Sequence, residues 1–335
     1  MHSWHTGRTL LSRALTHAVS SCLLLFCSAL LAVLSLPAQA GAALPVRAAI
    51  MFNMNTGGIL YQKNADTPIP PASLTKVMTS YIVHDALAQG SLSMGTKVRI
   101  PALAVRAGGS TMKLRTGEKV TVQRLLQGAL IASGNDAATA LAIRTGGSIE
   151  NFVGRMNAKA RSLGMTRTRF KNPTGLPAAG QVTTARDMAR LCLSYLANYP
   201  QVLKIHSLSS FEHRNRTLTT TNPFLGSRGV NGLKTGFTVD SGYNIILTTA
   251  GPTRLLIVVM GGKSKTRREI AASTLLELGL KYPGDANLIR RTIDGSSRHL
   301  KAKKRTGIKT RAYAKKKKAP ASRGTKKVHK KRRQQ

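Results

Sequence analysis

The sequence predicts a mixed α/β domain in which helices pack on an antiparallel sheet, preceded by an export signal and followed by a basic tail. One hairpin-like pair of strands lies at 48–62, and three consecutive β-branched, apolar segments lie at 230–260. Between and after them, apolar residues recur at helical spacing. Residues 41–283 are numerous enough to bury a sizeable core, so we expect them to form one domain.

The first 40 residues have the pattern of a secretory signal. Arg8 and Arg13 give a positively charged start, an apolar run extends from Cys22 to Leu36, and Ala38-Gln39-Ala40 is a small-residue cleavage site. The apolar run is shorter than the roughly 20 residues that a membrane-spanning helix needs, and an uncleaved anchor is the alternative. We therefore expect an exported protein of the periplasm or cell envelope, with a mature chain starting near Gly41.

The first predicted helix carries a serine and a lysine one turn apart. It follows a hairpin in which Asn55-Thr56-Gly57-Gly58 joins strands at Ala48–Met54 and Ile59–Gln62. The helix is indicated by an apolar stripe at Leu74, Val77, Met78, Tyr81 and Ile82. Ser73 falls in its first turn, and Lys76 projects from the same side.

A second serine lies at a break between two predicted helices. The first of these runs from Thr121 to Ile131, and an Ala-rich helix follows from Asp136 to Ile143. The break is Ser133-Gly134-Asn135, and we expect Asn135 or Asp136 to cap the second helix. From this break the Ser133 hydroxyl could pass a proton between lysines and a leaving amine.

The third motif, Lys234-Thr235-Gly236, lies on a predicted sheet. The strands are Val230–Thr238, Tyr243–Thr249 and Arg254–Met260, and the turns between them indicate antiparallel pairing. A final helix at about 265–280 has the apolar residues to pack back on this sheet.

Each motif alone is weak, but together the three supply the parts for acyl transfer without a histidine. A serine hydroxyl needs an adjacent base. Lys76 can serve as that base if burial or a cation such as Lys234 disfavours its charge. The first turn of the helix favours negative charge developing near Ser73. Lys234 and Thr235 can hold a terminal carboxylate, and Gly236 lets a substrate backbone approach closely.

In this order the motifs are those of penicillin-binding proteins and class A β-lactamases. Two further segments match, Asn172-Pro173-Thr174-Gly175-Leu176 and Thr183-Thr184-Ala185-Arg186-Asp187-Met188-Ala189. From about Leu44 to Leu280 the chain resembles the serine D-alanyl-D-alanine carboxypeptidases, which are low-molecular-mass penicillin-binding proteins. The resemblance implies a β-lactamase/transpeptidase-like fold, with a central antiparallel sheet sandwiched by helices and a helical lobe beside it.

The resemblance also implies roles for individual residues. Ser73 would be the acylated nucleophile, Lys76 its general base and Ser133 a proton relay. Five residues would bind the substrate: Asn135, Lys234, Thr235, Gly236 and Phe237. The backbone N–H groups of Ser73 and Phe237 would form the oxyanion hole. The implied reaction removes the terminal D-alanine from peptidoglycan stem peptides through an acyl-enzyme, with β-lactams as covalent inhibitors and with neither a metal nor a cofactor.

The chain departs from the family's pattern in two places. Many members have a polar residue, often His, where this chain has Phe237, which puts rate or specificity in doubt. Many also carry a β-rich second domain that ends in an amphipathic membrane helix. Here residues 284–335 stand in its place.

Three other functions fit parts of the sequence. A class A β-lactamase would need a Glu-x-x-Leu-Asn-like segment, which the chain lacks between Asn135 and Lys234. A D,D-endopeptidase that cuts peptidoglycan cross-links shares the same machinery and stays open. A non-enzymatic binder of polyanions would explain the basic tail but not the ordered motifs.

The tail, predicted at 284–335, is strongly basic. The whole chain has a net charge of +40, and from Gly295 onward it carries 18 Lys and Arg with no Asp or Glu. Such a segment has too few apolar groups to offset the entropy of ordering, so we expect it to be disordered. We expect it to contact an anionic membrane or a cell-wall polymer, whereas nucleic acid is an unlikely partner.

Overall fold

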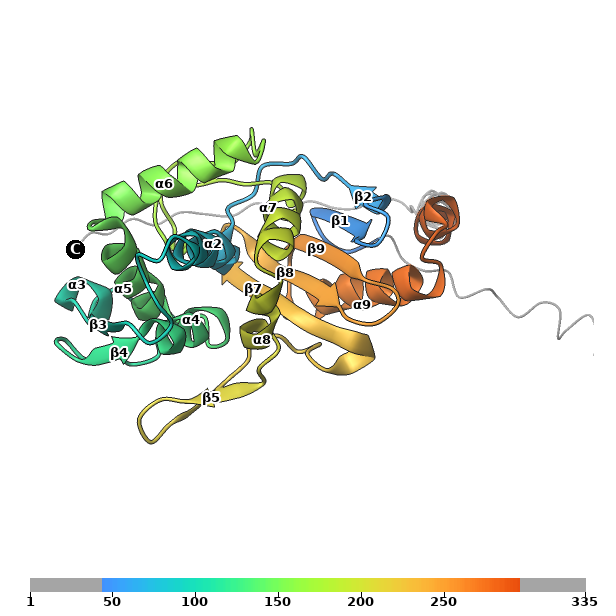
Figure 1. The fold of residues 1–335 in the computed structure, drawn as a ribbon. Helices are drawn as coiled ribbons and strands as arrows, with labels where there is room; N and C mark the ends of the chain where they lie inside the picture. Colours follow the sequence, from blue (N-terminus) through green and yellow to red (C-terminus); the bar gives the residue numbers. More distant parts are fainter. Residues whose placement is uncertain (1–43, 296–335) are drawn as a thin grey trace, which may run out of the picture. The chain divides into compact units, whose positions relative to one another are not determined.

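The computed structural model describes residues 44–295, which are built around a five-stranded antiparallel sheet (Figure 1). In spatial order β2-β1-β9-β8-β7 the strands are Ile59–Lys63, Ala48–Asn53, Leu255–Gly262, Gly242–Thr249 and Val230–Thr238. The predicted hairpin and the three predicted strands are all present. They join because β1 pairs with β9, with Ile50 opposite Val258. The predicted signal at 1–40 lies outside the described residues.

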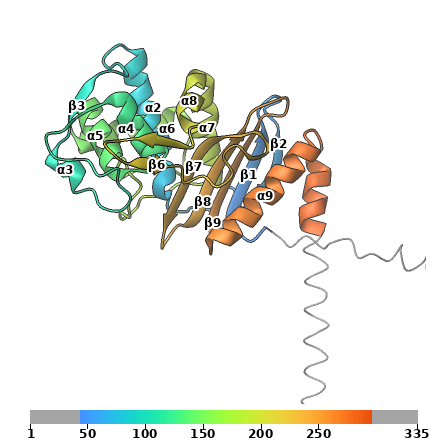
Figure 2. The same ribbon diagram turned by 90° about the horizontal axis from the view of Figure 1, so that it is seen from below.

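Helices cover both faces of this sheet (Figure 2). On one face, alternate residues of β9 such as Leu256 and Val258 belong to the core that includes α2 (Thr75–Ala88) and α7 (Ala185–Asn198). On the other face, intervening residues such as Ile257 belong to the core that includes α9 (Lys265–Lys281). Successive strand residues point to opposite faces, so a strand buried on both must be apolar throughout. The predicted sandwich is therefore confirmed.

A helical lobe stands beside the sheet, on the left in Figure 1. Its elements are β3 (Lys97–Arg99), α3 (Ala102–Val105), β4 (Lys119–Thr121), α4 (Val122–Leu130), α5 (Asn135–Gly146) and α6 (Ile149–Ser162). The Thr121 hydroxyl caps α4 by accepting the Arg124 N–H at 3.2 Å. Two further elements lie between α7 and β7 in the chain: α8 (Leu203–His206) and the hairpin of β5 (Ser210–Glu212) and β6 (Thr217–Thr219).

The predicted cap of α5 is wrong. The N-cap residue is Gly134, with no side-chain cap, and Asn135 is the first helical residue. From inside the helix, the Asp136 carboxylate accepts the Ala137 N–H at 2.8 Å, and it also accepts N–H groups from Met112 at 3.0 Å and Leu114 at 3.1 Å. Both candidate capping side chains are therefore used in tertiary contacts, which a local capping pattern does not reveal.

The ordered chain also extends beyond the predicted start of the tail at 284. Residues 286–295 form a helix whose Ile289 and Ile293 are buried in the core that includes α9. These two isoleucines are one turn apart, and their apolar stripe is enough to dock a short helix. The tail beyond residue 295 lies outside the described residues. Between residues 44 and 295, none of the helices has the length and apolar composition needed to cross a bilayer.

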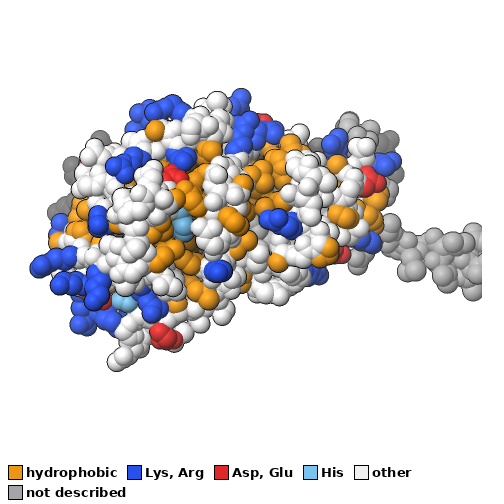
Figure 3. Space-filling model, viewed as in Figure 1, with side chains coloured by type: hydrophobic (Ala, Val, Ile, Leu, Met, Phe, Trp, Pro, Cys, Tyr) orange, Lys and Arg blue, Asp and Glu red, His pale blue; other side chains and the backbone are white. Residues whose placement is uncertain are grey.

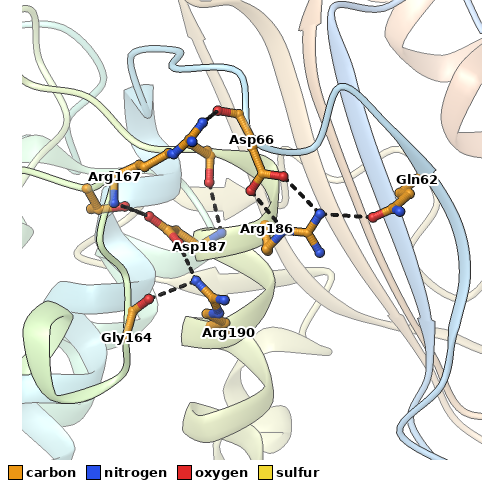
Figure 4. Close-up of polar contacts among 9 residues, drawn as sticks. Gln62, Asp66, Gly164, Arg167, Arg186, Asp187 and Arg190 are labelled. Carbon is orange, nitrogen blue, oxygen red and sulfur yellow. Dashed lines mark hydrogen bonds and ion pairs between the residues drawn. The ribbon is translucent and has the colours of Figure 1, made fainter.

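A polar network fixes the start of α7 against the segment that leads from β2 toward Ser73 (Figure 4). Arg186 forms two hydrogen bonds with the Asp66 carboxylate, at 2.8 and 2.9 Å. Next to it, buried Asp187 accepts the Arg167 N–H at 3.0 Å and pairs with Arg190 at 3.0 Å. Through Arg186 and Asp66, the start of α7 is thus fixed to the segment that precedes Ser73.

We predict that Asp187→Ala destabilises the fold far more than Asp66→Ala. The Asp187 side chain is 3% exposed, and its removal takes the acceptor from the part-buried Arg167 N–H and Thr168 hydroxyl, which costs about 3 kcal/mol. The Asp66 side chain is 46% exposed, so loss of its ion pair costs at most about 1 kcal/mol. Urea unfolding of both variants measures the difference, and equal losses would contradict the structural role given to Asp187.

Candidate functional site

Ser73 lies in a 3₁₀ turn, Ala72–Leu74, that directly precedes α2, so the predicted first-turn position is shifted by a few residues. Two glycines allow neighbouring backbone to pack on this turn. A Cβ on Gly236 would lie 3.0 Å from the Ser73 nitrogen, and a Cβ on Gly175 would lie 1.7 Å from the Ala72 carbonyl oxygen. Gly236 therefore has a structural reason to be glycine, beside the predicted approach of a substrate.

Lys76 is fully buried and its amine has three polar contacts. Its Nζ lies 2.8 Å from Ser73 Oγ, 2.7 Å from Asn135 Oδ1 and 2.8 Å from the Thr174 carbonyl oxygen. The amide and carbonyl oxygens can only accept hydrogen bonds. A neutral amine has two N–H groups and one lone pair, so the two N–H groups serve those oxygens. The lone pair then faces the Ser73 hydroxyl.

The electrostatics favour that neutral amine. Burial holds the pKa of Lys76 well below its ordinary value, repulsion from Lys234 lowers it further, and Asp136 opposes both effects. Burial also lowers the pKa of Lys234, to about 7. Burial therefore disfavours the charge on both lysines, and for Lys76 this matches the lone pair that its hydrogen bonds leave facing Ser73.

The second and third motifs meet at Lys234. Its Nζ donates to Ser133 Oγ at 3.0 Å and to the Thr235 carbonyl oxygen at 2.9 Å. Ser133 has a φ of 60°, a left-handed backbone that is uncommon outside glycine and asparagine. That backbone presents the Ser133 hydroxyl to the lysine. The Thr235 hydroxyl donates to Thr221 Oγ1 at 2.6 Å.

Asn135 connects the lysine base to the lobe. While its Oδ1 accepts from Lys76, its Nδ2 donates to the Gly108 carbonyl oxygen at 2.9 Å, which fixes the orientation of the amide. Its backbone N–H donates to the Ser110 carbonyl oxygen at 2.7 Å. The loop over 108–114 is thereby held against the site.

Phe237 follows the Lys-Thr-Gly motif on β7. Its side chain is 51% exposed and stacks on Tyr243, with ring centroids 4.2 Å apart. The sequence-predicted residues are thus brought together from the 3₁₀ turn, α2, the start of α5 and β7.

Sequence reasoning missed two contributors. The Thr174 carbonyl oxygen accepts a hydrogen bond from Lys76 Nζ, although the sequence alone indicates no chemical role for the Asn-Pro-Thr-Gly segment. His206 supports β7 from behind, where its Nδ1 lies 3.1 Å from the Leu233 carbonyl oxygen. Burial lowers the pKa of His206 to about 3, so the ring is neutral and this nitrogen donates. The match of the Asn-Pro-Thr-Gly segment to the family could have indicated the role of Thr174. No local sequence pattern indicates the role of His206.

Comparison with known proteins identifies the class to which this fold and site belong. Residues 37–264 match the model of peptidase family S11, D-alanyl-D-alanine carboxypeptidase, and the chain belongs to this family. It is 39% identical over 253 residues to the D-alanyl-D-alanine carboxypeptidase DacC of Escherichia coli, covering 70% of this chain and 61% of that protein. The chain thus spans about three fifths of that relative's length.

Two other similar proteins bear on the site. A D-alanyl-D-alanine endopeptidase of Pseudomonas aeruginosa is 33% identical over 226 residues, covering 64% of this chain and 71% of that protein. Among solved structures, penicillin binding protein 5 of Haemophilus influenzae superposes with a TM-score of 0.69 and 34% identity, covering 71% of both chains. The fold implied by the resemblance is therefore that of solved penicillin-binding proteins.

We predict that Gly175→Ala disrupts the site, whereas Gly180→Ala in the same segment does not. Both glycines have positive φ, 83° and 75°, so each substitution bears about 1 kcal/mol of backbone strain. The Cβ at 175 would also overlap the Ala72 carbonyl oxygen, while the Cβ at 180 has its nearest atom at 3.7 Å. Thermal unfolding should show a much larger loss for Gly175→Ala. Similar melting temperatures would show that the Ala72 turn yields easily.

Proposed function

We propose that this chain is a serine-type D-alanyl-D-alanine carboxypeptidase that removes the terminal D-alanine from peptidoglycan stem peptides. The observation that carries the proposal is the buried Lys76 amine 2.8 Å from Ser73 Oγ, with acceptor-only oxygens on its other two contacts. Membership of the carboxypeptidase family supports the same substrate class.

Acylation begins at Ser73. The Lys76 lone pair takes the hydroxyl proton as Oγ attacks the carbonyl carbon of the penultimate D-alanine. The oxyanion that forms is stabilised by the backbone N–H groups of Ser73 and Phe237. Gly236 packs closely on the turn that contains Ser73. This packing supports an oxyanion hole made of the Ser73 and Phe237 N–H groups, because it brings the two backbone segments together.

The leaving amine needs a proton when the peptide bond breaks. Ser133 is placed to deliver it, since its hydroxyl is hydrogen-bonded to Lys234. The proton that Lys76 took from Ser73 then replaces the one that Ser133 gives, and Lys76 is neutral again. Lys234 and Thr235 bind the terminal carboxylate of the substrate, and Asn135 binds its backbone. Water then attacks the acyl-enzyme as Lys76 takes its proton. Lys76 returns this proton to Ser73 Oγ as the ester bond breaks, and the shortened peptide leaves.

The direct test is covalent labelling with fluorescent penicillin, followed by product analysis. We predict that wild-type protein is labelled and that Ser73→Ala is not, since the label is an ester on Ser73 Oγ. Mass spectrometry of purified muropeptides should show loss of one alanine with wild type only. Undiminished labelling of a folded Ser73→Ala variant would refute the assignment of the nucleophile.

The lowered pKa values of Lys76 and Lys234 predict that activity falls at acidic pH through Lys76 and at alkaline pH through Lys234. Acylation falls at acidic pH because protonated Lys76 has no lone pair. A lysine is charged below its pKa, so above pH 7 free Lys234 becomes neutral and holds a carboxylate less well. KM should then rise by up to about tenfold per pH unit. In Lys234→Arg the guanidinium stays charged, so this rise should vanish. The same rise in both proteins would exclude Lys234 as its origin.

We further propose that the chain is exported and that its tail holds it at an anionic envelope surface. The support is the sequence alone, with its secretory pattern and the 18 Lys and Arg after Gly295. Each basic residue close to an anionic membrane contributes about 1 kcal/mol of attraction, and salt screens it beyond about 8 Å.

This anchor is tested by co-sedimentation of the full chain and of a chain ending at residue 295. Anionic vesicles and purified sacculi should retain the full chain at low salt, release it at high salt, and retain little of the shorter chain. Truncation at 295 keeps the buried Ile289 and Ile293, so the domain core is unaltered. Binding that is insensitive to both truncation and salt would place the anchor elsewhere.

A further inference from the structure

A strongly basic cleft lies between the 112–115 loop of the lobe and the tip of the β5–β6 hairpin at 213–216. Its volume is about 840 Å³, and its lining includes Lys113, Arg115, His213, Arg214 and Arg216. Figure 3 shows Lys and Arg side chains gathered at this lower left part of the surface, over β3, β4 and the hairpin. We call the space between these five residues the basic cleft.

The charges of the basic cleft are poorly compensated. Glu118 Oε1 lies 3.4 Å from both His213 Nε2 and Arg214 Nε. Within residues 44–295, Lys113, Arg115 and Arg216 have no carboxylate within ion-pair distance. Arg214 also donates to the Lys113 carbonyl oxygen, which joins the two walls. The cleft therefore presents three uncompensated cations on a connected frame, which favours an anionic ligand.

Both walls of the cleft continue into the acyl-transfer site. The loop wall is bound to the Asp136 carboxylate through Met112 and Leu114, next to Asn135. The hairpin wall leads from β6 to Thr221, whose Oγ1 lies 2.6 Å from Thr235 Oγ1. Under the proposed function, Thr235 holds the carboxylate of the leaving amino acid. The two walls of the cleft are therefore joined to residues on both sides of the acyl-transfer site, Asn135 and Thr235.

We propose that the basic cleft is a subsite for an acidic leaving peptide, so that the enzyme accepts cross-linked substrates whose leaving amine carries a further carboxylate. This inference rests on the proposed function and names a substrate class for the same site. The cleft's volume suits a short peptide segment. Its continuity with Thr235 favours a peptide attached to the scissile bond over a separate anionic polymer.

The test compares two synthetic substrates that are identical up to the scissile D-alanine carbonyl. In both, the leaving amine is the α-amine of D-lysine, and the side-chain amine of this lysine is acylated by N-acetylglutamic acid or N-acetylglutamine. We expect wild type to cleave the glutamic acid substrate with a kcat/KM roughly fivefold higher at low salt, since exposed ion pairs are individually weak. High salt should reduce this preference.

The variant is Lys113→Gln combined with Arg216→Gln, which removes two cleft cations. Its matched control is Lys97→Gln combined with Lys119→Gln, two exposed lysines on β3 and β4 that do not line the cleft. We expect the preference to fall to near unity in the cleft variant and to persist in the control. The rate of acylation by penicillin should be the same in all three proteins.

The outcomes separate the two proposals. Equal preference in wild type and the cleft variant overturns the subsite, as does failure to cleave either extended substrate while Ser73 is still acylated. If short-chain polyphosphate inhibits wild type but not the cleft variant, and wild type shows no preference for the acidic peptide, the cleft is a site for an anionic polymer and the peptide subsite is overturned. Loss of both acylation and D-alanine release overturns the proposed function itself, and the subsite with it.

Discussion

The contact between the buried Lys76 amine and Ser73 is the interaction on which the site depends. An ammonium ion without exposed surface is costly unless anions compensate it. Its hydrogen-bond partners are two uncharged oxygens and a hydroxyl. The neutral amine satisfies all three with no charge to desolvate. Stability and reactivity therefore favour the same protonation state, and the fold need not store strain to hold a free base.

Several segments far apart in sequence exist to keep that amine in place. The Thr174 carbonyl is positioned by a turn that only glycine at 175 allows, and the Asn135 amide is oriented by the lobe loop through Gly108. Beyond Lys76, β7 brings Lys234 to Ser133, and His206 braces that strand from behind. The sheet and the lobe each supply part of the site, and neither holds it alone.

The elements with strong periodic patterns were predictable from the sequence. The three strands and α4 have apolar patterns that match their burial. The hairpin and α9 were also predictable, although Ile270 on α9 is exposed, and all these elements end within a residue or two of the predicted positions. The grouping of Ser73, Lys76, Ser133, Asn135 and Lys234 was predictable through the order of the motifs. The cap of α5, the role of the Thr174 carbonyl and the helix at 286–295 were not, because each depends on tertiary contacts that no local pattern records.

The pairing of β1 with β9 has a consequence for how the molecule matures. The sheet opens with strands from the start of the domain and is completed only by strands from its end, so its central contacts have very large sequence separation. Proteins with such topologies fold slowly, because the entropy of closing long loops is lost before the contacts between the strands stabilise the fold. Ser73 and Lys234 lie on opposite sides of that gap in the chain. A growing or partly folded chain therefore holds the two halves of the site apart, and chemistry becomes available only when the last strand docks.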